Sequence, residues 1–249
     1  MNKEIISNKQ AVSLMLLFIL GSTLIVGTSG VAKKDTWIAV ILALLLSIPI
    51  MLVYCNIISI FPGKDIFDIS TMIFGKFFGK IINILYIWFA LHLGSLVLYN
   101  FNEFINIIAL PETPKLVPSF FFIALCAWGV KEGIEVLGRW SELFVIFLIF
   151  VLFLESLLSI PNFKLYNILP ILEEGIKPIM TGAFSIFAFP FAETVVFIMV
   201  FSSLKNEKSP FKAYIIGLLI SGIFLVTISA RNILVLGSYI LSLNYLCFP

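Results

Sequence analysis

Charged residues are scarce in this chain of 249 residues: Asp, Glu, Lys and Arg together make up 12% of it, and there is one histidine. A soluble domain typically carries about 25% charged residues. Hydrophobic residues account for 61% of the sequence, and the mean hydropathy is +1.12. The shortage of charge excludes an ordinary soluble domain and indicates a polytopic membrane protein.

Cysteine is also scarce, and Cys55, Cys126 and Cys247 stand far apart without C-x-x-C spacing. This pattern indicates neither a disulfide framework nor a zinc site, so we expect the three side chains to pack in apolar surroundings. The sequence has no P-loop, no G-x-S-x-G, no H-E-x-x-H and no basic-aromatic pattern. We therefore predict no enzyme activity, no cofactor, no metal and no nucleic-acid partner.

Long uncharged stretches are what the sequence does have, and most approach the roughly 20 residues needed to cross a bilayer. We predict an all-α membrane protein whose single domain, residues 1–249, has about seven spans. These spans cover residues 10–30, 37–60, 81–110, 116–130, 139–160, 178–203 and 211–236. The tail, residues 232–249, is either the outer end of the seventh span with a re-entrant piece, which we prefer, or the start of an eighth.

Single residues mark where these spans begin and bend. Ser7 or Asn8 is expected to cap the first helix, and Pro49 is expected to kink the second. The amphipathic residues 65–80 are predicted to lie along the inner membrane face. The placement of the 16 Lys and Arg residues favours a cytoplasmic N-terminus, because more of them fall in the loops on that side.

Two of the predicted spans contain residues that interrupt a helix. In a membrane, backbone groups without helical partners cost several kcal/mol each, so a broken span persists only where those groups line a cavity or bind something. Paired interruptions in corresponding spans point to a transporter-like site near the midplane. The predicted ligand-binding residues are therefore those of the two breaks: Gly21, Ser22, Thr23 and Gly27 in the first span, and Ser185, Phe187, Phe189 and Glu193 in the sixth.

Each of these residues has a structural interpretation as well. Amides of an unwound turn at Gly21, Ser22 and Thr23 would meet a ligand carboxylate, whereas small residues also let helices approach closely. The phenylalanines would line a ligand side chain or contact lipid and core. Glu193, which costs about 2.5 to 3.5 kcal/mol at a helix centre, would carry a proton or cation, pair with a ligand ammonium, or bond to the freed backbone.

Other titratable residues in the spans have plainer interpretations. We expect His92 to be neutral and hydrogen-bonded within the bundle rather than part of a proton path. Glu142 is expected to pair with Arg139, three residues earlier, near the inner surface. Glu155 is expected near the outer end of its span.

Short motifs along the whole chain resemble the B-subunit family of spore germinant receptors, the endospore germination permeases of the amino acid-polyamine-organocation transporter superfamily. Each motif is weak alone, but their order is specific. The motifs are I-S-N-K-Q at 6–10, F-I-L-G-S at 18–22, D-T-W-I at 35–38, F-P-G-K at 61–64, F-G-K at 74–76, G-K at 79–80, L-P-E-T-P at 110–114, G-I-E at 133–135, G-R at 138–139, L-P-I-L at 169–172, E-G at 174–175 and F-P-F-A-E at 189–193.

This resemblance implies two inverted five-helix repeats with broken first and sixth helices around a small-molecule site. The first repeat would cover about residues 7–160, and an incomplete second repeat about residues 178–249. Since that fold has ten helices, we expect the chain to be a fragment or a truncated product, or its remainder to be supplied elsewhere.

The resemblance also implies a function: a subunit of the spore inner membrane that senses a small germinant, most simply an amino acid. It would signal with A-type and C-type receptor subunits and contact membrane lipid. The alternative is an autonomous amino acid permease driven by protons or sodium.

Overall fold

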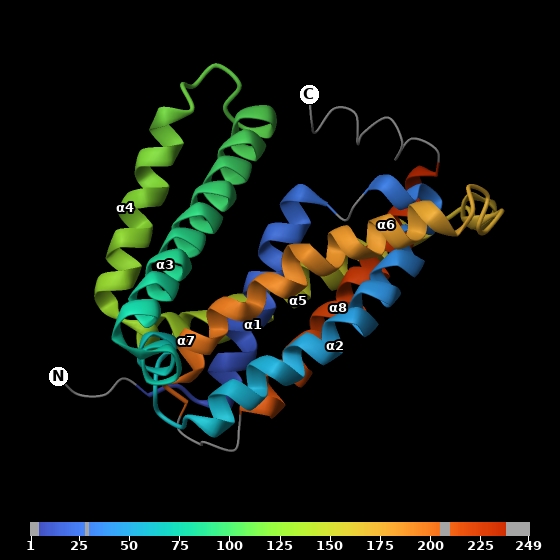
Figure 1. Ribbon diagram of the computed structural model, residues 1–249. Coiled ribbons are helices and arrows are strands. Elements are labelled where there is room, and N and C mark those ends of the chain that lie inside the picture. The colour runs from blue at the N-terminus through green and yellow to red at the C-terminus, as the bar shows by residue number, and fades with distance from the viewer. Residues whose placement is uncertain (1–4, 28–29, 205–209, 238–249) are drawn as a thin grey trace.

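The protein is helical throughout the part that the structure, a computed structural model, describes: residues 5–27, 30–204 and 210–237 (Figure 1). The long helices there are α1 (Asn8–Val26), α2 (Thr36–Ile60), α3 (Ile66–Ile108), α4 (Leu116–Glu132), α5 (Ile134–Ser159), α6 (Ile176–Ile186) and α8 (Pro210–Leu236). Shorter turns of helix are η1 (Gly30–Asp35), η2 (Ile160–Asn162), η3 (Leu165–Ile168), η4 (Phe187–Phe191), η5 (Ala192–Val196) and α7 (Phe197–Phe201). The predicted all-α class is confirmed.

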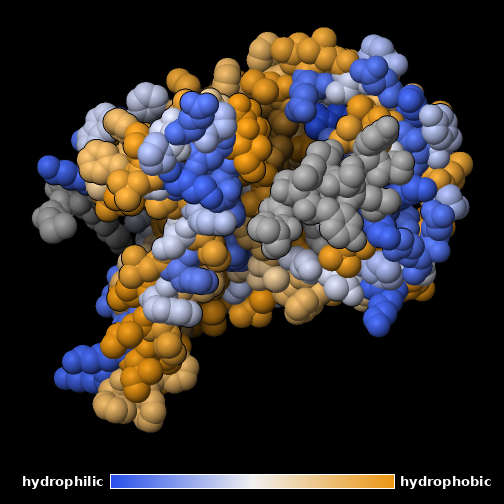
Figure 2. Space-filling model, turned by 90° about the horizontal axis from the view of Figure 1, so that it is seen from above, coloured by the Kyte–Doolittle hydropathy of each residue, from blue (hydrophilic) through white to orange (hydrophobic). Residues whose placement is uncertain are grey.

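Six stretches of the described residues are long and apolar enough to cross a membrane, and the fifth of them runs from Ile176 through the interrupted region to Phe201. The predicted span that is not among these six is the fourth, residues 116–130; it corresponds to α4, which has 17 residues and falls short of the others. The view from above shows apolar and hydrophilic side chains mixed (Figure 2). Large apolar side chains such as Phe120, Val130 and Phe153 are more than 60% exposed, as expected for a surface in contact with lipid. The tail beyond Gly237, with Cys247, lies outside the described residues.

The first helix begins where the sequence predicts. Ser7 accepts a hydrogen bond from the Gln10 amide, and the Gln10 side chain accepts one from the Ser7 amide, which completes a capping box. Just before the cap, the Ile6 amide donates to the Ser203 carbonyl at 2.9 Å, and Ile6 is fully buried. The start of α1 and the end of α7 therefore lie at the same end of the molecule.

Helices α1, α2, α6 and α8 form the core, and α5 packs against α1 (Figure 1). Small residues allow these contacts: a Cβ on Gly217 of α8 would lie 2.6 Å from the Met15 sulfur, and one on Gly182 would lie 3.0 Å from the Ala32 Cβ. Dispersion between closely approaching helices, rather than a hydrophobic driving force, holds such bundles together in lipid.

The α3–α4 hairpin stands apart from this core (Figure 1). Of the most apolar 18-residue stretch of α3, only 6% is buried inside the protein. Near its start, α3 turns sharply at Gly75, whose φ of 73° favours glycine, and the chain then passes so close to itself that a Cβ on Gly79 would lie 2.7 Å from the Thr71 Cα. Residues before Gly75 therefore form a separate short helical segment within the predicted stretch 65–80, and its position along the inner membrane face stays a prediction.

Ion pairs correct one detail of the sequence-based expectations. Arg139 pairs with Glu135, four residues earlier, and not with Glu142. Glu155 lies 2.9 Å from Arg231, so this contact joins α5 to α8. Pro49 lies within α2, which remains helical from Thr36 to Ile60.

Candidate functional site

The predicted interruption of the first span is wrong at Gly21, Ser22 and Thr23, and the helix ends instead at the fourth predicted residue, Gly27. Gly21, Ser22 and Thr23 are helical, and α1 continues to Val26 before ending at Gly27, whose φ is 81°. Thr23 donates to the Ile19 carbonyl at 2.6 Å, so its buried hydroxyl is engaged within the helix itself. The pattern of small residues was misread because glycine and serine in a membrane helix serve packing and cavity lining as well as unwinding.

The predicted interruption of the sixth span is confirmed. After Ile186 the chain forms the widened turn η4, in which Phe189 has extended dihedral angles (φ −131°, ψ 118°) before Pro190. The tighter turn η5 follows, and regular helix resumes at Phe197. Proline lacks an amide proton, so it removes a helical hydrogen bond at this point.

Three tyrosines from three other helices support the broken segment. The hydroxyls of Tyr54, Tyr86 and Tyr214 donate to the carbonyls of Ala192, Val195 and Thr194, at 3.0, 3.3 and 3.2 Å respectively. They come from α2, α3 and α8. The tyrosine hydroxyls thus stabilise the interruption by donating to backbone carbonyls in a segment that is not a regular α-helix.

Thr194 lies at the centre of this arrangement and is fully buried. Its hydroxyl donates to the Phe191 carbonyl at 2.6 Å, which ties η5 back to η4. Sequence reasoning missed Thr194 and the three tyrosines. A signal was present, since a tyrosine inside an apolar span needs an acceptor for its hydroxyl.

A cavity of about 540 Å³ lies between α1, α3 and α4, and the end of η5 borders it. Gly21 and Ser22, both predicted as ligand-binding residues, lie in its wall. Nothing lies within 4 Å of a Cβ placed on Gly21, so a larger side chain there would extend into open space. The lining residues are Leu17, Phe18, Gly21, Ser22, Ala90, Leu93, Gly94, Val97, Leu98, Phe101, Phe122, Cys126 and Val196.

The other predicted site residues lie elsewhere. Thr23 is buried in the helix packing and Gly27 is exposed at the end of α1. Ser185 is exposed, while Phe187 and Phe189 are half-buried. None of them lines the cavity.

Glu193 is half-buried in η5, and no hydrogen bond or ion pair joins its carboxylate to another of the residues that the structure describes. The freed carbonyls on either side of it are occupied by tyrosines instead. His92, the other titratable group of interest, stacks on Trp88 with ring centroids 5.4 Å apart.

The cavity wall is apolar apart from the Ser22 hydroxyl and the Cys126 thiol. Its volume falls within the roughly 300 to 1,000 Å³ of small-molecule sites, which are mostly apolar with a few polar groups. A helical membrane bundle with an interrupted span beside such a cavity defines a transporter-like membrane protein.

Sequence comparison identifies the family. A family model described as spore germination protein matches residues 5–246, and the chain belongs to this family of membrane proteins. No solved structure matches the chain.

Its curated relatives carry corresponding names. The chain is 28% identical over 239 residues to spore germination protein KB of Bacillus subtilis (strain 168), covering 95% of this chain and 64% of that protein. It is 23% identical to spore germination protein YndE of the same organism, covering 85% and 57%, and 27% identical to spore germination protein GerQB of Bacillus cereus, covering 63% and 44%. The chain therefore spans less than two thirds of the length of each of these relatives.

Proposed function

We propose that this chain is the permease-like subunit of a spore germinant receptor, and that it binds a small germinant in the cavity beside the broken span. The observation that carries the proposal is the position of the cavity. Its wall combines Gly21 and Ser22 with Val196, which ends the interrupted segment η5. A ligand there touches the span whose helix is interrupted at Pro190.

The chemistry of the wall suits the side chain of an apolar amino acid, while no charged residue among those that the structure describes lines the cavity to pair with its ammonium or carboxylate group. Phe18, Leu93, Phe101 and Phe122 offer apolar surface, and the Ser22 hydroxyl is available to a polar group of the ligand. Such a ligand changes the conformation of the bundle only if it binds one state more tightly than the other. A shift of the broken segment would then be passed to the A-type and C-type partner subunits in the spore inner membrane.

Filling the cavity tests this function. In spores that carry the complete protein, Gly21→Leu places a leucine side chain in the cavity, whereas Gly21→Ala leaves most of it empty. We expect the leucine variant to need at least about tenfold more germinant, because the side chain occupies space the ligand needs, and the alanine variant to respond nearly as wild type. The measurement is the loss of optical density of spore suspensions exposed to single L-amino acids.

Protein level in the spore membrane is the control for folding. A normal response of the Gly21→Leu spores at a normal protein level contradicts the proposed site. Loss of the response in both variants points to α1 packing instead of cavity filling.

Glu193 supports a second candidate function, an autonomous permease coupled to protons or sodium. A half-buried carboxylate without a partner among the described residues is the kind of group that carries a cation across a membrane. Uptake of labelled amino acids into vesicles that contain this protein without partner subunits would favour it.

A further inference from the structure

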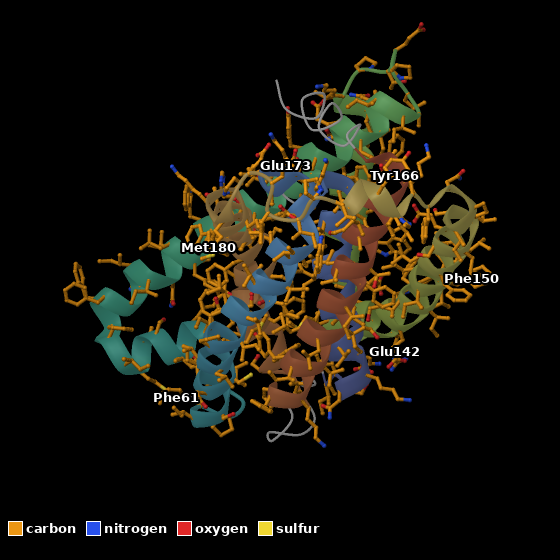
Figure 3. All side chains as sticks on the ribbon, turned by 90° about the vertical axis from the view of Figure 1, so that its right-hand side faces the viewer. Phe61, Glu142, Phe150, Tyr166, Glu173 and Met180 are labelled. Atoms are coloured by element: carbon orange, nitrogen blue, oxygen red, sulfur yellow. The ribbon has the colours of Figure 1, made fainter. Side chains whose placement is uncertain are left out.

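A second, smaller cavity lies at the end of the molecule where the loop before α6 meets η1. It has a volume of about 230 Å³, and five charged side chains line it: Lys33, Lys34, Asp35, Glu173 and Glu174. Glu173 and Tyr166 mark this end in Figure 3, opposite Phe61 and Glu142. This polar cavity shares no lining residue with the apolar cavity beside η5.

Two ion pairs close the cavity from the loop side. Lys33 pairs with Glu174, and Lys34 lies 3.2 Å from Glu173. These four side chains are partly exposed, and their charges cancel in pairs. The fifth charged side chain, Asp35, belongs to neither ion pair.

Asp35 is only 6% exposed, and one of its oxygens is unsatisfied. Its Oδ2 accepts a hydrogen bond from the Leu172 amide at 3.0 Å. Its Oδ1 is fully buried and has no hydrogen-bond partner among the described residues. Asp35 precedes α2, yet its side chain makes no capping bond to that helix; it accepts the bond from the loop instead, and Asp35 is among the residues that line the cavity.

A buried carboxylate oxygen without a partner costs free energy, and a positive charge removes that cost. The cavity carries three carboxylates against two ammonium groups, so one positive charge balances it. Asp35, Glu173 and Glu174 line the cavity, but in the part of the chain that the structure describes they do not converge into a set of metal ligands, which favours a monovalent ion over a divalent metal. The space is sufficient for a small ammonium compound or for an ion with several waters.

We propose that this cavity binds a single positive charge, either an organic ammonium group or an alkali-metal ion, with Asp35 as its principal ligand. The occupant bridges Asp35 at the start of α2 and the loop that carries Glu173 and Glu174. Binding therefore fastens that loop to the start of α2. This proposal does not depend on the function of the apolar cavity.

The test measures ligand-dependent thermal stability of the purified chain in detergent. N-methyl-D-glucamine chloride, whose cation is too bulky for the site, is replaced at constant ionic strength by methylammonium, potassium or sodium chloride. A ligand that binds only the folded state raises Tm in a saturable way. We expect such a rise with at least one of the three salts, and the salt that produces it distinguishes an ammonium site from an alkali-metal site.

Charge variants link that rise to Asp35. Asp35→Asn keeps the shape and the bond to Leu172 but should weaken the apparent affinity at least about tenfold, since it removes the charge nearest the ligand. Lys34→Gln adds net negative charge and should tighten binding. Glu112→Gln, an exposed carboxylate in the α3–α4 turn, is the matched control and should change nothing.

Three results would overturn the proposal. The first is that none of the three salts raises the Tm of the wild-type protein in a saturable way, which would mean that a proton satisfies Asp35. The second is an unchanged affinity in Asp35→Asn. The third is an unchanged or weaker affinity in Lys34→Gln. The first and third of these do not require the Asp35 variant to fold.

Discussion

Tyr214 is fully buried, and its hydroxyl donates to the Thr194 carbonyl in the broken span. A buried acceptor that loses its donor costs about 1 to 3 kcal/mol. Tyr214 also packs edge-on against Phe201, so removal of the hydroxyl alone leaves the aromatic contact in place. The hydroxyl can therefore be tested separately from the ring.

We expect Tyr214→Phe to lower the free energy of unfolding by about 1 to 3 kcal/mol, because the Thr194 carbonyl stays buried without this donor. The measurement is denaturant-induced unfolding in detergent micelles. Tyr166→Phe, at a ring 68% exposed, is the matched control and should have no effect. Equal stabilities of the Tyr214→Phe variant and the wild type would mean that the tyrosine does not support the interruption.

At this scale the sequence was informative where a residue acts on its own neighbours. The Ser7 cap was predictable because a capping box involves residues three positions apart. The partner of Arg139 was misassigned because residues three and four positions apart are both neighbours on a helix. The three tyrosine hydroxyls were not predictable as a group, since their acceptors lie 20 to 138 residues away in the chain.

At the scale of an element, α3 folds back on itself so that Gly79 lies close to the backbone of the segment before Gly75. A Cβ on Gly79 would lie 2.7 Å from the Thr71 Cα and 3.0 Å from the Ser70 carbonyl oxygen. Neither atom belongs to a flexible side chain that can move aside. The short segment before Gly75 is thus fixed against the long one after it.

Gly79→Ala should therefore lower Tm, although alanine is otherwise favoured over glycine in a helix by about 1 kcal/mol. Overpacking typically costs about 1 to 3 kcal/mol, which exceeds that gain. Gly94→Ala, in the same helix with nothing within 4 Å of the added Cβ, is the matched control and should leave Tm unchanged or raise it. A higher Tm for Gly79→Ala would show that the segments separate readily.

The two predicted helix interruptions had opposite outcomes for a physical reason. The sixth span contains Pro190, which cannot donate a helical hydrogen bond, so the break is dictated locally. In the first, Gly21, Ser22 and Thr23 are compatible with a helix when neighbours pack against it, and α1 ends only at Gly27. Proline is a strong signal for a break in a span, whereas small residues are an ambiguous one.

At the scale of the whole molecule, the sequence predicts a cytoplasmic N-terminus, and the structure provides sites to test it. Glu173 and Glu142 lie at opposite ends of the bundle (Figure 3). In a cysteine-free background, we expect Glu173→Cys to react with a membrane-impermeant maleimide in intact cells, and Glu142→Cys to react only after permeabilisation. The positive-inside distribution of Lys and Arg is the reason.

Labelling is measured by the mass shift of the protein on a gel. Reaction of Glu142→Cys, but not Glu173→Cys, in intact cells would reverse the orientation. It would also move the cavity at Asp35 to the cytoplasmic side.

The length of α3 has a consequence for the membrane around the protein. From the turn at Gly75 to Ile108 the helix has roughly 33 residues and a length of about 50 Å, whereas the hydrocarbon core of a bilayer is about 30 Å thick. With so little of its surface buried by the protein, α3 meets this mismatch by tilting or by projecting beyond the hydrocarbon. We therefore expect the angle of the α3–α4 hairpin, and with it the width of the apolar cavity that α3 lines, to depend on bilayer thickness.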